Sequence, residues 1–126
     1  MTETLGTVIR FHNAHTSIDV TVDEDNSAVR SLIAQLPLKN LDFADNEGYE
    51  KLTRLTDPLD TADSPASGIR PGDLICFTPW NSIAFWYDPD GFEPREQLVH
   101  MGRYDATMDQ LEALTRAPVS AHLATD

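Results

Sequence analysis

The four histidines are the side chains of this chain most able to hold a metal ion. His12 and His15 have the spacing H-x-x-H, whereas His100 and His122 stand alone much later in the sequence. A protein metal site needs further ligands in a closed geometry, and the residues around His12 supply none. The sequence therefore predicts no metal site and no cofactor, and it favours surface or turn positions for the histidines.

The single cysteine, Cys76, lies between Ile75 and Phe77 in an apolar run. Nucleophilic attack by a thiol needs an activating base, so this setting indicates a buried, reduced thiol instead. One cysteine cannot form an internal disulfide, which is typical of a cytoplasmic protein. The sequence contains no G-x-S-x-G, P-loop or G-x-G-x-x-G motif, and DPDG at 88–91 indicates a turn because a calcium loop needs more ligands.

The length, charge and hydropathy of the chain limit the classes of protein to which it can belong. The chain has 126 residues, a net charge of -12 and a mean hydropathy of -0.34, which predicts one globular domain over residues 1–126. Such an acidic chain is repelled by phosphate backbones and anionic lipid, so we expect neither nucleic-acid nor membrane binding. No apolar run reaches the length of a membrane span, and the N-terminus does not resemble a signal peptide. The oligomeric state cannot be inferred from these features.

Apolar and aromatic residues concentrate in PGDLICFTPWNSIAFWY, residues 71–87, which holds five of the ten aromatic residues and one charge, Asp73. Phe77, Phe85 and Tyr87 have strand spacing, which indicates a core role. Trp80 follows a proline at a predicted turn, where a ring either seals a barrel end or lines a ligand groove. Both interpretations of Trp80 stay open from the sequence.

The elements that position these residues are mostly short strands. Alternating or apolar runs predict eight of them, at residues 7–12, 16–22, 38–45, 48–55, 72–79, 82–88, 97–104 and 119–124. A helix is predicted after an N-cap at Asn26 or Ser27, and a capping box from Thr107 to Gln110 predicts a second. Gly102, within a predicted strand, indicates a close backbone approach or a bend. A long polar loop spans 56–71, and the pattern is typical of a barrel or sandwich.

The segment GIRPGDLICFTPWNSIAFWY, with LVHMGRYD after it, resembles the small bacterial and archaeal cyclophilin-like family, and the resemblance covers nearly the whole chain. Asn81 and Met101 stand where that family usually has glycine and leucine. The resemblance implies a mainly β fold, a closed cyclophilin-like eight-stranded barrel with two short helices. The biochemical role of the family is largely unassigned.

True prolyl isomerases of this fold use an arginine beside an apolar pocket. By order along the chain, the resemblance implies Arg54 as the catalytic candidate, although the Q-G-G-D motif of true cyclophilins follows no arginine here. Arg54 also fits a solvent-facing strand position. Arg103 belongs to the family's own motif, where it either pairs with an acid or contacts a ligand. The ligand-binding candidates are therefore Phe77, Trp80, Phe85 and Arg103.

Three functions stay open from the sequence. The first is a module that binds a peptide or small molecule in a shallow groove near Trp80, Phe85 and Arg54, beside the loop at 56–71. The second is a peptidyl-prolyl isomerase that uses Arg54 as its electrostatic group, since a donor aimed at the proline nitrogen and a dry pocket favour rotation. The third, by fold analogy alone, is an accessory domain of an amide-hydrolysing assembly.

Overall fold

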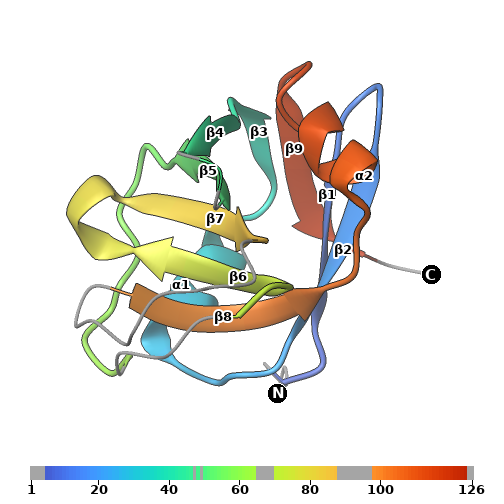
Figure 1. The fold of residues 1–126 in the computed structure, drawn as a ribbon. Coiled ribbons are helices and arrows are strands. Elements are labelled where there is room, and N and C mark those ends of the chain that lie inside the picture. Colours follow the sequence, from blue (N-terminus) through green and yellow to red (C-terminus); the bar gives the residue numbers. More distant parts are fainter. Residues whose placement is uncertain (1–4, 47, 49, 65–69, 88–97, 125–126) are drawn as a thin grey trace.

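A single curled sheet makes up most of the molecule in the computed structural model, which describes residues 5–46, 48, 50–64, 70–87 and 98–124 (Figure 1). The strands are β1 (Val8–His12), β2 (Ser17–Val22), β3 (Leu38–Leu41), β4 (Ala44–Asn46), β5 (Glu50–Arg54), β6 (Asp73–Phe77), β7 (Ser82–Trp86), β8 (Leu98–Tyr104) and β9 (Val119–Leu123). The helices are α1 (Ser27–Gln35), α2 (Met108–Ala113) and the 3-10 turn η1 (Thr78–Trp80). Each strand pair is antiparallel, in the order β3-β9-β1-β2-β8-β6-β7-β5-β4.

The closed eight-stranded barrel predicted from the sequence is corrected in two respects. The described chain forms nine strands, and the sheet curls through 285° without closing. The predicted strand 38–45 divides in two: β3 ends at Leu41 and β4 begins at Ala44. The left-handed φ of 60° at Asn40 lies inside β3, where the pairing with β9 shifts register. β3 then pairs with β9 and β4 with β5, so the two halves end at opposite edges of the sheet.

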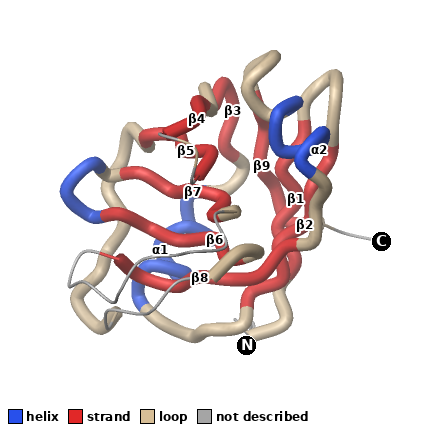
Figure 2. Tube along the Cα trace, viewed as in Figure 1, coloured by secondary structure: helices blue, strands red, loops and turns tan. Residues whose placement is uncertain are grey.

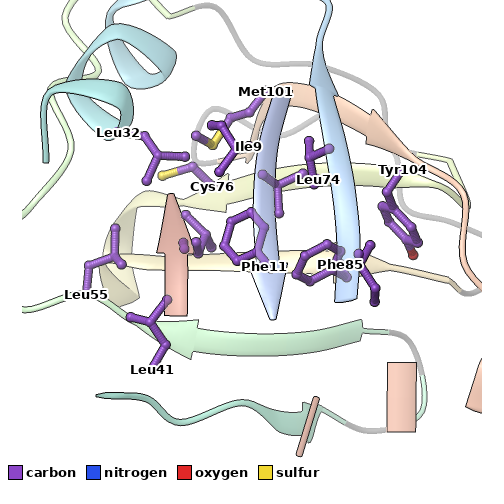
Figure 3. Packing of buried hydrophobic residues seen from close by; sticks show 14 of the residues in the cluster. Ile9, Phe11, Leu32, Leu41, Leu55, Leu74, Cys76, Phe85, Met101 and Tyr104 are labelled. Atoms are coloured by element: carbon purple, nitrogen blue, oxygen red, sulfur yellow. The ribbon is translucent and has the colours of Figure 1, made fainter. Parts of the chain in front are cut away.

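The core fills the inside of the curled sheet (Figure 3). Phe85 is its centre, with its ring 5.1 Å from Phe11, 5.6 Å from Phe43 and 5.0 Å from Tyr104. These rings come from four separate parts of the chain and meet mostly edge to face, an arrangement that stabilises aromatic pairs. Burial on both faces of β6 and β7, predicted from their continuous apolar runs, is confirmed.

The two helices lie at different ends of the sheet (Figure 2). Asn26 caps α1 by accepting a hydrogen bond from the Val29 N–H at 2.9 Å, and its side-chain amide donates to the His100 carbonyl at 3.1 Å. The cap thus ties α1 to β8. α2 begins with the predicted capping box at Thr107. The Asn13 amide in the β1–β2 turn donates to the carbonyl of Ala113, the last residue of α2, and to that of Ala117 in the segment after it.

The described part of the loop after β5 covers the start of α1. The Asp63 carboxylate accepts a hydrogen bond from the Ser27 N–H at 2.5 Å, and the Ser64 hydroxyl accepts one from the Ala28 N–H at 3.0 Å. These bonds satisfy N–H groups that a helix start leaves without partners. Residues 56–64 therefore have a structural role in holding α1.

Candidate functional site

A β-bulge in β8 determines which side chains reach the outer face of the sheet. Ile75 pairs with His100 and Leu74 with Gly102, so Met101 is an extra residue. The bulge places His100 and Arg103 on the same outer face, on either side of the buried carboxylate of Asp73. A Cβ on Gly102 would lie 2.8 Å from the Thr21 carbonyl oxygen, which confirms the predicted close approach.

Asp73 is the centre of a charged network on this face. It accepts hydrogen bonds from the Arg103 guanidinium and, at 3.1 Å, from the Arg70 N–H, and its side chain is 1% exposed. His100 lies between two carboxylates, with Nδ1 3.4 Å from Asp73 and Nε2 2.5 Å from Asp23. Arg103 thus pairs with an acid, one of the two roles that the resemblance left open.

Burial and hydrogen bonding have opposite effects on the pKa values of Asp73 and His100. Burial alone would raise the pKa of Asp73, but the hydrogen bonds from His100 and the Arg70 N–H outweigh it and hold the pKa below the usual 3.8. For His100, burial lowers the pKa, but the bonds to Asp73 and Asp23 raise it above 6.5 overall. The two carboxylates therefore favour the charged form of His100, which suits a structural clamp.

Two further titratable groups that could act as nucleophiles are held in unreactive forms. Burial raises the pKa of the Cys76 thiol to about 11, so it stays protonated at neutral pH. The Lys51 ammonium, 1% exposed, lies 2.8 Å from Asp45 and 2.9 Å from Glu112 of α2. Burial alone would lower its pKa, but these two bonds outweigh burial and raise it, so Lys51 carries its charge and joins β5 to α2.

The structure separates the residues predicted to form the site. Phe85 points into the core and is fully buried, on the opposite face of the sheet from Arg54. Arg103 lines a hollow of about 550 Å³ together with Arg10, Asp19 and Asp105, on the outside of β1, β2 and β8. The Trp80 side chain lies outside the described residues, although its backbone is part of η1.

Arg54 and Phe77 do come together on the outer face. In the sheet register Arg54 pairs with Ser82, and Ser82 pairs with Phe77, so the three residues form one row across β5, β7 and β6. We call these three residues the outer row. Arg54 is exposed and lines a hollow of about 350 Å³ with Asn40, Asp42, Ala44, Leu52 and Thr53. On its other side the row continues into a small apolar cluster with Ile75, Ala84, Trp86 and Leu98.

Ser82 is the member of the outer row that sequence reasoning missed. It is 1% exposed, and among the described side chains its hydroxyl is a buried polar atom without a hydrogen-bond partner. A single serine within an apolar strand gives no indication in the sequence that it belongs to a binding site. Only the register between β5, β6 and β7 shows that it lies between a cation and an aromatic ring.

The family model described as cyclophilin-like matches residues 9–124. The chain belongs to the cyclophilin-like family. A solved structure with a similar fold is the solution structure of a hypothetical protein from Archaeoglobus fulgidus, at a TM-score of 0.71 and 18% identity, with 95% of this chain and 96% of that one covered. At that identity the likeness shows the fold alone, and no curated protein matches this cyclophilin-like chain.

The family's motifs are explained by contacts in the structure. A Cβ on Gly72 would lie 2.8 Å from the Arg103 guanidinium, so the Gly-Asp pair at 72–73 leaves room for the arginine that it binds. Asn81 has a left-handed φ of 51°, which explains why glycine is usual there. Asparagine tolerates this conformation, and its amide donates to the Leu55 carbonyl at 2.6 Å. In the described part of the chain, no helix is long and apolar enough to cross a membrane.

Proposed function

We propose that this cyclophilin-like chain is a binding module that takes a peptide or a small molecule at the outer row. Adjacent strands are about 4.8 Å apart, so Arg54 and Phe77 emerge roughly 10 Å from each other with Ser82 between them. That span fits a short peptide segment. Arg54 offers hydrogen-bond donors for a carbonyl, and the partly buried Phe77 ring offers an apolar surface.

The observation that carries this proposal is the Ser82 hydroxyl. It has no hydrogen-bond partner within the described part of the chain. A buried hydroxyl without a partner destabilises a protein by about 1–3 kcal/mol, and native proteins rarely keep one. A ligand carbonyl that accepts a hydrogen bond from Ser82 would remove this cost on binding. Because Ser82 is only 1% exposed, binding requires a side-chain rearrangement over it.

The charge of the chain narrows the ligand class. With a net charge of -12, the molecule repels polyanions, so nucleic acids and anionic membranes are poor partners. A neutral peptide that carries one carbonyl for Arg54 and one apolar side chain for Phe77 fits the row best. A cytoplasmic location, suggested by the buried reduced Cys76, belongs to the same proposal.

An NMR titration with the peptide Ala-Ala-Pro-Phe tests the proposal. We expect saturable shifts of the amide signals of the outer row, and a weaker affinity in Arg54→Ala, by about tenfold for a lost charged hydrogen bond. The matched control is Arg30→Ala, which removes an exposed arginine from α1. Equal weakening by both variants would show a general charge effect and contradict a site at Arg54.

Prolyl isomerisation is the second candidate, and the shared face of Arg54 and Phe77 favours it. Rotation about an X–Pro bond is slow, and a donor aimed at the proline nitrogen beside an apolar surface accelerates it. Exchange spectroscopy on the same peptide measures the rate between its cis and trans signals. Faster exchange with the wild type, lost in Arg54→Ala, would make the module an enzyme; unchanged exchange with intact binding would leave a binding module. The accessory-domain interpretation rests on fold analogy alone and stays a prediction.

A further inference from the structure

Two histidines that are far apart in the sequence meet on the outer face of β1 and β9. Arg10 pairs with His122 and His12 with Ser120, so His12 and His122 are diagonal neighbours on that face. Their ring centroids are 5.0 Å apart, with an interplanar angle of 71°. Both side chains are only partly buried, so solvent and ions reach them. The outer row and the charged network use neither histidine.

The hydrogen bonding of His122 leaves a nitrogen available. Its Nδ1 lies 2.9 Å from the Leu123 carbonyl oxygen, and because a carbonyl can only accept, Nδ1 donates. Nε2 of the neutral ring then carries the lone pair. A backbone carbonyl bound to the other ring nitrogen is the usual way in which proteins orient a metal-ligating histidine.

The separation of the two rings suits a shared metal ion. A metal bound about 2.0 Å from one nitrogen of each ring, at a tetrahedral angle, places the two ring centroids roughly 5 Å apart. The observed centroid separation of 5.0 Å matches this spacing, so a shared ion requires only that side-chain rotation turns one nitrogen of each ring toward it.

Close to the pair the charges balance, because Asp19 is paired with Arg10, which lies across from His122 in the sheet register. Asp19 lies close enough to His122 to interact with it electrostatically, and its carboxylate is held by Arg10 at 2.8 and 3.1 Å. Asp19 is therefore a neighbour of the pair rather than a third ligand. The chain's net charge of -12 raises the local cation concentration over the whole surface.

We propose that His12 and His122 bind a divalent late transition-metal ion, Cu²⁺, Ni²⁺ or Zn²⁺, with water in the remaining positions. Imidazole is a preferred ligand of these ions. No group of three His, Cys, Asp or Glu side chains able to hold a metal is found within the described residues, so the site has two protein ligands and is open. The H-x-x-H spacing of His12 and His15 gave no indication of it, because the partner of His12 lies on β9.

Titration with ZnCl₂, followed through the NMR signals of the histidine rings, tests this site. In the wild type we expect the His12 and His122 signals to shift together and to saturate, while the His15 signal does not follow them. His122→Gln should weaken zinc binding by more than about tenfold, the loss typical of even an outer-shell partner. Acidification should also weaken binding, because a ligating imidazole must be neutral.

His15→Gln is the matched control, since it removes an exposed histidine from the same hairpin. It should leave zinc affinity unchanged. His12→Gln provides a second test and replaces His122→Gln if that variant fails to fold. The proposal is overturned if the two signals do not shift in the wild type, or if His15→Gln weakens binding as much as the other variants. Either result would leave the pair as an edge-to-face contact of two rings only.

Discussion

The inner and outer faces of β6, β7 and β8 differ sharply in what they hold. The inner face packs one continuous apolar core around Phe85. The outer face of the same strands carries a smaller apolar cluster, the buried carboxylate of Asp73 with its partners, and the Ser82 hydroxyl, which has no partner among the described residues. Since successive residues of a strand point to opposite faces, neighbours in the sequence serve different purposes. The inner face supplies most of the apolar core, while the outer face combines a smaller apolar cluster with polar groups, of which the Ser82 hydroxyl has no structural role among the described contacts.

The largest expected effect is the loss of stability when a ring is removed from the inner face rather than from the outer face. Phe85→Ala removes a fully buried ring and should lower the free energy of unfolding by about 3–5 kcal/mol. Phe77→Ala, on the outer face and only partly buried, should cost about half as much or less. Urea unfolding of both variants measures the difference. Equal losses would contradict the division between a stabilising inner face and a binding outer face.

The β-bulge in β8 brings Gly102 close to β2, so we expect a larger residue at this position to destabilise the fold. Gly102→Ala places a Cβ 2.8 Å from the Thr21 carbonyl oxygen and 2.8 Å from Val20, so we expect a loss of about 1–3 kcal/mol. The amide signals of Val20 and Thr21 should shift as β2 moves away. Gly6→Ala is the control: its Cβ meets nothing within 4 Å, so any cost comes from its φ of +85° alone. Unmoved β2 signals in Gly102→Ala would show that the bulge is not a close contact.

The charged network around Asp73 and His100 predicts that the stability of the fold depends on pH. The carboxylates of Asp73 and Asp23 face His100, while Arg103 and Arg70 face Asp73. The folded protein raises the pKa of His100 above 6.5, so its stabilising effect is complete below 6.5 and is lost as the pH rises through the raised value. Urea unfolding from about pH 6 to pH 9 should show this decline. His100→Gln should remove the decline and His15→Gln should retain it; a decline that persists without His100 would assign it to another group.

The smallest expected effect concerns Ser82. Replacing it with alanine removes a buried hydroxyl without a described partner, so Ser82→Ala should raise the free energy of unfolding by about 1 kcal/mol. The same substitution should weaken binding of Ala-Ala-Pro-Phe, which is the trade-off expected of a binding residue. A loss of stability in Ser82→Ala would mean that the hydroxyl has a partner in the folded protein and would remove the main support for the outer row.

Local pattern was enough to predict much of the fold. The alternation of β2, the two-sided apolar runs of β6 and β7, the capping box at Thr107 and the bend at Gly102 are all properties of a few neighbouring residues. The split of residues 38–45 was missed because β3 pairs with β9 and β4 with β5, and local pattern does not contain such long-range pairing. The sheet stays open at this break between Leu41 and Ala44.

The candidate sites depend on pairing between distant strands, which local pattern does not contain. Arg54, Ser82 and Phe77 form a row only in the register that β5, β7 and β6 adopt. His12 and His122 meet only because β9 returns beside β1. A shift of one residue in either register would turn these side chains to the other face.

The most direct test of the central claim is a map of the amide signals that shift when the wild-type protein binds Ala-Ala-Pro-Phe. We predict that the largest shifts fall on Arg54, Ser82 and Phe77, at adjoining positions of β5, β7 and β6. Signals of β1 and β9, on a different part of the sheet, should stay unchanged. Shifts centred on β1 and β9, or no saturable shift at all, would contradict a binding site at the outer row.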